Sequence, residues 1–560
     1  MSFLKIDNLS VNYGMRKETV YAVKNINIDV KKGEILGLVG ESGSGKSTLG
    51  NAIINLIDEP GKISNGTVIL DGINIHEKPE DILKYRGKKI GLIFQDPQTS
   101  LNPLLTIGEQ LVETIQTHLK LNIDESKNRA INLLNEVGIK DAKSRFDNYP
   151  HQFSGGMRQR VVISLALCCE PELLIADEPT TALDVSIQSQ ILELIKTLTK
   201  ERNLAVILIT HDMGVISETA DRVAVMKNGD LVEIGLTKEI LTNPKEIYTK
   251  SLISSVPPTN KKILRFKIIE KEKNEEREGN IKILNRWDKK KIISQDLIKM
   301  KNLKKTFQDG IFTETSKNTV MAVDDVSFNI REGESFGLVG ESGSGKSTIA
   351  KMIVNLFKPT SGEIFFDNIC ITKIKKNKEM MNFRKQIQMI FQDPYSSLNG
   401  RLKVRDIIAE PIKLHNSSIT DNDLDDYIND LLESVELSKK SAIRYPHEFS
   451  GGQRQRISIA RALATQPRLL VCDEPTSALD VSIQAQILNL LKDLQEQLNL
   501  TILFISHDLP VVRQMCDRIG VLRNGKLCEI SETEKLFLEP EHEYSKELLR
   551  LMPKIESIYN

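Results

Sequence analysis

The sequence predicts an α/β fold that occurs twice in the chain, each copy being built around a mostly parallel sheet. A segment of identical sequence, Gly37–Thr48, recurs at Gly337–Thr348, and a repeat at a fixed offset is typical of duplicated domains. In both copies a glycine-rich loop lies between an apolar strand and a helix. Short apolar runs such as Leu173–Ala176 and Ala205–Ile209 have the length of strands that are buried in a parallel sheet.

Other landmarks recur at almost the same offset. Gln95 recurs as Gln392, whereas Ser154, Asp177 and His211 recur as Ser450, Asp473 and His507. We therefore predict a first domain over residues 1–259, a charged connector over 260–296 and a second domain over 297–560. In the first domain we expect a strand over Glu34–Val39, a helix from near Lys46 and mainly helical structure from Ile107 to Leu134.

The connector is rich in Lys and Glu, and two interpretations of it are open. Apolar residues alternate with polar ones at Leu264, Phe266 and Ile268, and again at Ile281 and Ile283, which is the pattern of a small hairpin. The charge content is equally typical of a solvated flexible linker.

Composition argues against several classes of protein. Lys+Arg and Asp+Glu both number 76, so no excess of positive charge favours a nucleic-acid partner. The six cysteines form no C-x-x-C pair, so we expect no disulfide framework, zinc site or iron–sulfur cluster, and a reducing cytosol. We also expect no membrane-spanning segment, because no apolar run approaches the roughly 18 residues that a span needs. We expect no signal peptide, because charged residues interrupt the apolar ones at the N-terminus.

The repeated segment contains the pattern G-x-x-x-x-G-K-[ST], which predicts a phosphate-binding loop (P-loop). Its glycines allow backbone N–H groups to close around phosphate oxygens at a helix N-terminus. Lys46 and Lys346 are expected to reach the β- and γ-phosphates of ATP, and Ser47 and Ser347 to bind Mg²⁺. The predicted ATP-binding loop residues are Gly40, Glu41, Ser42, Gly43, Ser44, Gly45, Lys46, Ser47 and Thr48, with Gly340, Glu341, Ser342, Gly343, Ser344, Gly345, Lys346, Ser347 and Thr348.

Two acidic residues follow an apolar strand in each copy. Asp177 and Asp473 are expected to hold the Mg²⁺ shell. Glu178 and Glu474 then remain to orient or deprotonate the attacking water.

These motifs and their spacing resemble the ATP-binding cassette (ABC) family over nearly the whole chain apart from the connector. Phe-Ser-Gly-Gly precedes a predicted helix and lies 23 residues before Asp177 or Asp473, where the family has its signature loop. The implied fold has two P-loop NTPase domains, each with a mostly parallel core sheet, an N-terminal antiparallel β subdomain and a helical signature subdomain. The implied signature residues are Ser154, Gly155, Gly156 and Met157, with Ser450, Gly451, Gly452 and Gln453.

The resemblance also implies roles for further residues. Gln95 and Gln392 match the Q-loop glutamine that senses Mg²⁺ and contacts the membrane partner. Ala182-Leu183-Asp184 and Ala478-Leu479-Asp480 match the D-loop, and His211 and His507 match the switch histidine that contacts the γ-phosphate. Tyr13 and Phe307 are candidates for the aromatic that stacks on adenine, and a packed core aromatic is the alternative there.

In this family two cassettes pair head to tail, so each ATP lies between the P-loop of one cassette and the signature of the other. Site one would join the first P-loop, Asp177, Glu178 and His211 to Ser450–Gln453, and site two would join the second set to Ser154–Met157. Met157 stands where the second copy has Gln453 and lacks its polar side chain, so we expect site two to be somewhat slower.

Two functions compete within the family: the motor of a membrane importer, and an ABC-F-type ATPase that acts on ribosomes. The sequence Tyr-Pro-His-(Gln/Glu)-Phe-Ser-Gly-Gly and the tails at 243–252 and 539–548 are similar to the oligopeptide, dipeptide and nickel importers. That resemblance implies two transmembrane permease subunits, an extracytoplasmic solute-binding protein reached through them, and a peripheral position on the cytoplasmic face of the membrane. ATP and Mg²⁺ are the expected cofactors.

Overall fold

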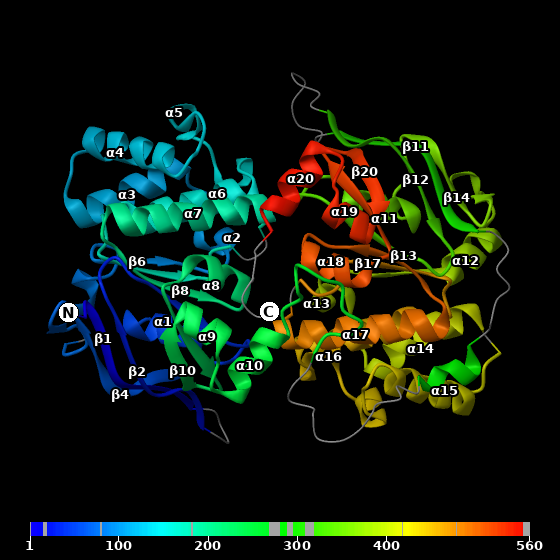
Figure 1. The fold of residues 1–560 in the computed structure, drawn as a ribbon, viewed down its shortest axis with the longest axis horizontal. Coiled ribbons are helices and arrows are strands. Elements are labelled where there is room, and N and C mark those ends of the chain that lie inside the picture. The colour runs from blue at the N-terminus through cyan, green and yellow to red at the C-terminus, as the bar shows by residue number, and fades with distance from the viewer. Residues whose placement is uncertain are drawn as a thin grey trace. The chain divides into compact units, whose positions relative to one another are not determined.

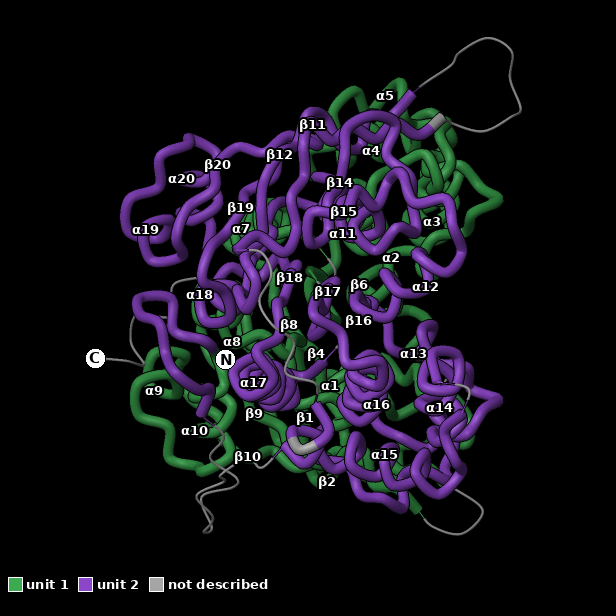
Figure 2. Tube along the Cα trace, turned by 90° about the vertical axis from the view of Figure 1, so that its right-hand side faces the viewer, with its two compact units in different colours: residues 1–256, 553–560 green, residues 257–552 purple. Residues whose placement is uncertain are grey.

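The computed structural model describes residues 2–14, 19–78, 81–180, 183–267, 281–287, 295–308, 319–416, 418–477 and 479–552. They form two compact units, which lie within residues 1–256 and within residues 257–552 (Figure 2). Both units contain the same two kinds of sheet, which confirms the predicted duplicated α/β fold. The boundary precedes the predicted end of the first domain at residue 259, and the start of the predicted connector belongs to the second unit.

The first unit is built on a six-stranded sheet in the order β10-β9-β3-β8-β7-β6, in which only the pair β9–β10 is antiparallel. A four-stranded antiparallel sheet in the order β2-β1-β4-β5 comes from its N-terminal part. The strands are β1 Leu4–Gly14, β2 Thr19–Val30, β3 Ile35–Val39, β4 Gly61–Leu70, β5 Ile73–Asn74, β6 Ile90–Ile93, β7 Leu173–Asp177, β8 Ala205–Thr210, β9 Arg222–Lys227 and β10 Asp230–Leu236.

Helices cover the central sheet, and their apolar residues explain why. In α7 the buried residues Ile191, Leu192, Ile195 and Leu198 recur on one face of the helix. In Figure 1 α3 and α4 lie on the side of the central sheet away from β1, β2 and β4, as expected for a helical signature subdomain. The helices are α1 Lys46–Ile53, α2 Pro97–Ser100, α3 Ile107–Leu119, α4 Ile123–Glu136, α5 Ala142–Arg145, α6 Gly155–Leu167, α7 Val185–Glu201, α8 Met213–Thr219, α9 Thr237–Thr242 and α10 Ile247–Ser254.

The second unit repeats this arrangement, with sheets in the orders β16-β17-β18-β13-β19-β20 and β12-β11-β14-β15. Its strands are β11 Asp296–Gln308, β12 Thr319–Arg331, β13 Ser335–Val339, β14 Ser361–Phe366, β15 Ile369–Cys370, β16 Ile387–Ile390, β17 Leu469–Asp473, β18 Thr501–Ile505, β19 Arg518–Arg523 and β20 Lys526–Glu532. Its helices are α11 Lys346–Ile353, α12 Asn377–Gln386, α13 Pro394–Ser397, α14 Val404–His415, α15 Asp421–Ser434, α16 Gly451–Leu463, α17 Val481–Leu498, α18 Leu509–Met515, α19 Thr533–Leu538 and α20 Glu543–Arg550.

The parallel order of the central strands brings four loops to one edge of each sheet. Strands β3, β6, β7 and β8 run in the same direction, so the segments after their C-terminal ends lie at the same edge. These segments contain the P-loop, Gln95, Glu178 and His211. The fold therefore gathers at that edge the motifs that the sequence scatters over more than half of the first unit.

Residues 257–267 and 281–287 pack against the rest of the second unit, so the part of the predicted connector at 260–267 and 281–287 is packed and not a freely solvated linker. Phe266, Ile281 and Ile283 are buried in the same core as α15 and α17. These residues form no hairpin strands, and residues 282–286 instead form a 3₁₀ helix. Ile268 lies outside the described residues. We call the two stretches together the strap.

Side chains of the second unit pair with the backbone of the strap. The Asn489 side-chain amide donates to the Phe266 carbonyl and accepts from the Phe266 N–H, both at 2.9 Å. The Gln514 side chain accepts from the N–H of Ile263 and donates to two strap carbonyls. Arg265 adds ion pairs to Asp493 and Glu496. The second unit thus binds this part of the strap mainly through hydrogen bonds to its backbone.

The corresponding surface of the first unit differs. The residues at the positions of Asn489 and Gln514, at the offset of 296 that relates Asp177 to Asp473, are Glu193 and Glu218. An ionised carboxylate accepts hydrogen bonds but donates none, so it cannot pair with a strap carbonyl as an amide does. The surface that holds the strap is therefore specific to the second unit.

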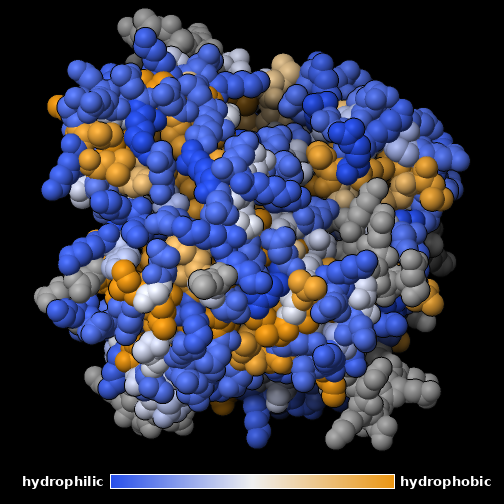
Figure 3. All heavy atoms as spheres, turned by 60° about the vertical axis from the view of Figure 1, so that its left-hand side comes forward, coloured by the Kyte–Doolittle hydropathy of each residue, from blue (hydrophilic) through white to orange (hydrophobic). Residues whose placement is uncertain are grey.

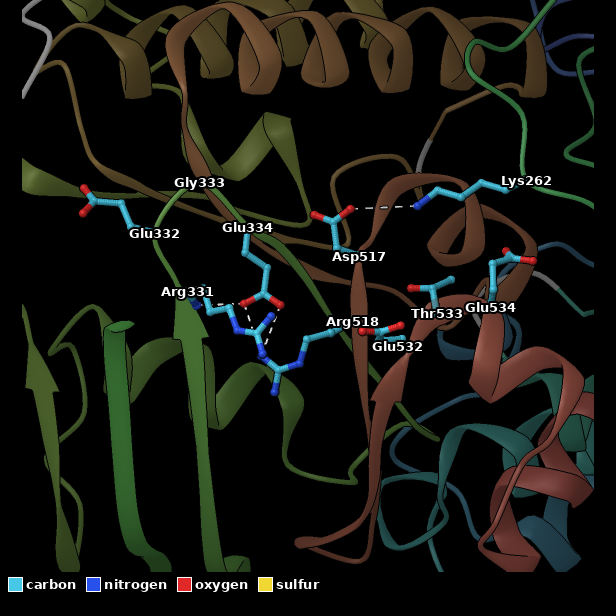
Figure 4. Close-up of a pocket in the computed structure, with 10 residues that line it drawn as sticks. All are labelled: Lys262, Arg331, Glu332, Gly333, Glu334, Asp517, Arg518, Glu532, Thr533 and Glu534. Carbon is cyan, nitrogen blue, oxygen red and sulfur yellow. Dashed lines mark hydrogen bonds and ion pairs between the residues drawn. The ribbon is translucent and has the colours of Figure 1, made fainter. Parts of the chain in front are cut away.

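A charged depression of about 460 Å³ lies beside the strap, at the edge of the second unit's central sheet away from the P-loop (Figure 4). Its charged groups pair with one another, since Arg518 contacts Glu334 at 3.1 Å and Lys262 lies 4.0 Å from Asp517. Its position at the N-terminal ends of β13 and β19 separates it from the loops described above.

Hydrophilic residues cover most of the face drawn in Figure 3, with smaller apolar groups between them. None of the helices in the described ranges has the length and apolar character to cross a bilayer.

The strap provides a test with a neighbouring control. Phe266 is 4% exposed, whereas Leu264, two residues earlier, is 88% exposed. Phe266→Ala removes buried contacts that typically contribute about 3 kcal/mol, so it should speed amide hydrogen exchange in residues 258–267 roughly 10²-fold. Leu264→Ala should leave exchange unchanged. Hydrogen exchange is measured by mass spectrometry. Equal exchange rates in the two variants would show that the Phe266 contact does not hold the strap.

Candidate functional site

Each P-loop is fitted tightly against neighbouring strands. Gly45 has φ of 99° as it begins α1, and a Cβ there would lie 2.1 Å from the Ala22 carbonyl oxygen of β2. A Cβ on Gly40 would lie 2.2 Å from the Met226 carbonyl oxygen of β9. Gly345 and Gly340 have the same constraints against Ala322 and Leu522. Glycine is required at these positions because the loop passes between backbone groups.

The P-loop lysines lie folded over their own loops. The Lys46 ammonium group donates to the carbonyl oxygens of Gly40 at 2.7 Å and Glu41 at 2.9 Å. Lys346 makes the same pair of bonds at 2.7 Å each. Both side chains are buried, so a phosphate that enters the loop finds a positioned positive charge.

A hydroxyl and a carboxylate meet beside each lysine. Ser47 Oγ donates to Asp177 Oδ1 at 3.1 Å, and Ser347 Oγ to Asp473 Oδ1 at 2.9 Å. Two oxygens at this separation fit adjacent positions of an octahedral Mg²⁺ shell, whose ligands are at roughly 2.0–2.1 Å from the metal. In the part of the chain that the structure describes, no group of three His, Cys, Asp or Glu side chains is arranged to hold a metal ion by itself.

The second acid of each pair joins three motifs. The Gln95 side-chain amide donates to Glu178 Oε2 at 2.8 Å, while His211 Nδ1 lies 3.0 Å from Glu178 Oε1. Gln392, Glu474 and His507 repeat this arrangement at 2.8 and 3.3 Å. Both glutamates have positive φ, 47° and 48°, a strained backbone that is common at functional sites. The structure thus brings together each predicted catalytic glutamate, Q-loop glutamine and switch histidine.

The carboxylates of the site have different electrostatic surroundings. Burial raises the pKa of Asp177 and of Asp473, more than their serine hydrogen bonds lower it. Burial would also raise the pKa of Glu474, but the hydrogen bond and charge of His507 lower it below its usual value. Burial by itself would lower the pKa of His507, but the hydrogen bond and negative charge of Glu474 raise it above its usual value. The buried aspartates therefore favour a bound cation, and Glu474 and His507 each stabilise the charged form of the other.

Each signature serine caps the helix that follows it. Ser154 Oγ accepts from the Met157 N–H at 3.3 Å at the start of α6, and Ser450 Oγ accepts from the Gln453 N–H at 3.4 Å at the start of α16. The Gln453 side chain also accepts from the Ser450 N–H at 3.1 Å and completes a capping box. Met157 has no oxygen for this bond, and its sulfur instead accepts from Arg145 at 3.9 Å.

The remaining predicted residues lie in the antiparallel sheets and the D-loops. Tyr13 is partly buried against the core, and Phe307 is 37% exposed and packs edge-on to Phe357. Ala182 and Ala478 of the D-loops lie outside the described residues, whereas Asp184 and Asp480 begin α7 and α17. A Cβ on Gly156 would lie 2.8 Å from Ile187 of α7, so the signature packs directly on the helix that follows the D-loop.

One pair of residues at the site was not predicted. The hydroxyls of Tyr248 and Tyr544 accept hydrogen bonds from the N–H groups of Glu41 and Glu341 in the P-loops. A tyrosine at the same place in both tails was the signal that could have revealed them.

The sequence pattern of the ABC transporter family matches residues 23–181 and 323–477, and that of the oligopeptide/dipeptide transporter C-terminal region matches residues 232–282. The glutathione import ATP-binding protein GsiA of Shigella dysenteriae serotype 1 (strain Sd197) is 42% identical over 99% of this chain and 90% of that protein. GsiA of Escherichia coli (strain K12) is 41% identical over the same shares. Among solved structures, a dimeric ATP-binding cassette bound to ADP and Pi is 33% identical, with a TM-score of 0.39, over 42% of this chain and 98% of that one.

The geometry of the lysines leads to a first test of this site. Alanine at both Lys46 and Lys346 should abolish ATP binding, and either single variant should weaken binding at its own loop roughly ten- to hundredfold, because a charged hydrogen bond contributes about 1.5–3 kcal/mol. Isothermal titration with ATP measures this. Lys32→Ala, which removes a surface ion pair to Glu172 and a cation–π contact with Phe3 in the N-terminal part of the unit, is the control. An ATP affinity that the double variant leaves unchanged would refute the assignment.

Proposed function

This chain belongs to the ABC transporter family of ATP-binding proteins, and from that premise we propose that it is the ATP-hydrolysing subunit of an importer for glutathione, peptides or a related small solute. The family match and the near full-length similarity to import ATP-binding proteins support an ATPase of import. The match to the oligopeptide/dipeptide transporter C-terminal region favours a peptide-like solute.

The main support for this proposal is the contact that Glu178 makes with both Gln95 and His211 beside the P-loop. Glu474, Gln392 and His507 make the same contacts in the second unit. A carboxylate held from two sides next to a phosphate-binding loop suits a group that orients one water molecule.

In the proposed reaction Glu178 or Glu474 holds a water molecule in line with the γ-phosphate and accepts its proton. The water oxygen bonds to the γ-phosphorus as the bond to the leaving ADP oxygen breaks. The P-loop N–H groups and lysine stabilise the charge on the phosphates, and the histidine keeps its carboxylate in place. Mg²⁺, held by Ser47 and Asp177 or by Ser347 and Asp473 with Gln95 or Gln392 nearby, would neutralise phosphate charge when bound.

We further propose that the two cassettes pair within the chain, as the family resemblance implies. Each ATP would then contact the P-loop of one cassette and the signature serine of the other. ATP would in this way hold the pair closed, and hydrolysis would release it. The exchange between the two states would drive transport.

The proposed partners are two permease subunits in the membrane and, through them, an extracytoplasmic binding protein, so the chain would act on the cytoplasmic face. Large apolar side chains near the Q-loops support this docking: Leu104 is 82% exposed and Tyr395 is 64% exposed. An ABC-F-type role on ribosomes is less well supported, because the relatives are import proteins.

Hydrolysis at both sites is tested by removing one proton acceptor at a time. Glu178→Gln should silence site one and Glu474→Gln site two, each lowering single-turnover hydrolysis at that site by ~10²-fold or more while ATP stays bound. Glu172→Gln, before the same strand as Glu178, should have no effect. Wild-type turnover in Glu178→Gln together with none in Glu474→Gln would show that only site two is catalytic.

The partner is tested by co-purification. The chain should co-purify with permease subunits from detergent extracts, and Leu104→Asp with Tyr395→Asp should reduce this while ATP binding persists, because a charge replaces an apolar contact. Ile73→Asp is the control, since Ile73 is also exposed, at 53%, but lies in the antiparallel sheet. Co-sedimentation with ribosomes, and none with membranes, would instead favour the ABC-F role.

A further inference from the structure

The tail helix of each cassette carries a buried tyrosine to the start of its own P-loop. Tyr248 belongs to α10 and Tyr544 to α20, and they are 7% and 1% exposed. Their hydroxyls accept from the Glu41 N–H at 3.1 Å and the Glu341 N–H at 3.3 Å. The contact occurs independently in both units, so it belongs to the cassette and not to one accidental packing.

The tyrosines are held in place by two further contacts in each unit. The Glu233 carboxylate of β10 accepts from the N–H groups of Lys245 and Glu246, which fixes the start of α10. The Lys227 ammonium group lies 4.4 Å from the centre of the Tyr248 ring. The second unit repeats both contacts with Glu529 and with Arg523, whose guanidinium lies 4.5 Å from the Tyr544 ring. A cation on the ring face restrains the ring and orients its hydroxyl.

The hydroxyl accepts a hydrogen bond from a peptide group that also holds the P-loop lysine. The Glu41 N–H and the Gly40 carbonyl are the two ends of one planar peptide unit. Tyr248 holds the N–H end, and Lys46 donates to the carbonyl end at 2.7 Å. Rotation of that peptide would break both hydrogen bonds at once. The tyrosine therefore keeps the Gly40 carbonyl oriented toward the Lys46 ammonium group.

We propose that Tyr248 and Tyr544 are positioning residues, through which the tail of each cassette sets the ATP affinity of its own P-loop. This rests on the proposed function in that the P-loops must bind ATP. Without the hydroxyl the first peptide of the loop loses its outer support, and the loop must be ordered again each time that phosphate binds. The loss falls on binding, because neither tyrosine reaches the reacting atoms.

The test isolates one P-loop at a time. In a Lys346→Ala background the first loop should bind ATP roughly ten- to hundredfold more tightly than the second, and in a Lys46→Ala background the reverse should hold. Tyr248→Phe, which removes only the hydroxyl, should weaken ATP binding by isothermal titration roughly two- to tenfold in the first background and not in the second. Tyr544→Phe should show the reverse. Single-turnover rates at saturating ATP should stay unchanged.

A buried tyrosine elsewhere provides the matched control. The Tyr427 hydroxyl donates to the Ala464 carbonyl at 3.3 Å in the helical part of the second unit. Tyr427→Phe also removes the hydrogen bond that this hydroxyl accepts from Gln466, so it should lower the unfolding temperature at least as much as Tyr544→Phe, without affecting ATP affinity in either background.

Each contrary outcome has a separate meaning. Unchanged affinity in Tyr248→Phe, or equal weakening in both backgrounds, would overturn the positioning role, because only stability would then have changed. Failure of the unmodified chain, as well as of the single-lysine variants, to bind ATP would overturn the proposed function instead, and with it the basis of the inference.

Discussion

The close passage of each P-loop between two backbone carbonyls is the contact on which the rest of the site depends. Gly40 and Gly45 approach Met226 of β9 and Ala22 of β2, strands that belong to different sheets. The loop therefore joins the antiparallel and parallel sheets of its cassette at one point. Because close-packed backbone cannot yield as a flexible side chain does, these two contacts hold the two ends of the loop, Gly40 and Gly45, in place.

The sequence allowed much of the fold and the centre of the site to be predicted, because both are written in local patterns. The apolar strands, the P-loops and the acids after β7 and β17 lie where the patterns placed them. The strap and the tyrosine contacts could not be predicted in this way. Tyr248 bonds to a residue 207 positions earlier, and Phe266 to one 223 positions later, and no local pattern encodes such pairs. The capping role of the Gln453 side chain could have been predicted, because S-x-x-Q is a known sequence signal for a capping box.

The two cassettes are alike where they handle phosphate and differ where they meet other parts of the chain. Their P-loops have identical sequences, and their glutamate–histidine–glutamine contacts agree within a few tenths of an ångström. The signature caps differ, since Ser450 has the Gln453 side chain as a partner and Ser154 has Met157 in its place. The residues proposed to act on ATP thus have one geometry in both cassettes, whereas the residues around them differ.

The strap determines the order in which the two cassettes can follow one another along the chain. It follows the first cassette, and the amides that pair with it, Asn489 and Gln514, lie on the second, where the first has Glu193 and Glu218. A gene with the halves in reverse order would encode the same motifs, but its connector would meet carboxylates that cannot donate to its carbonyls. The order of the halves is thus fixed by how they are joined and not by the catalytic motifs.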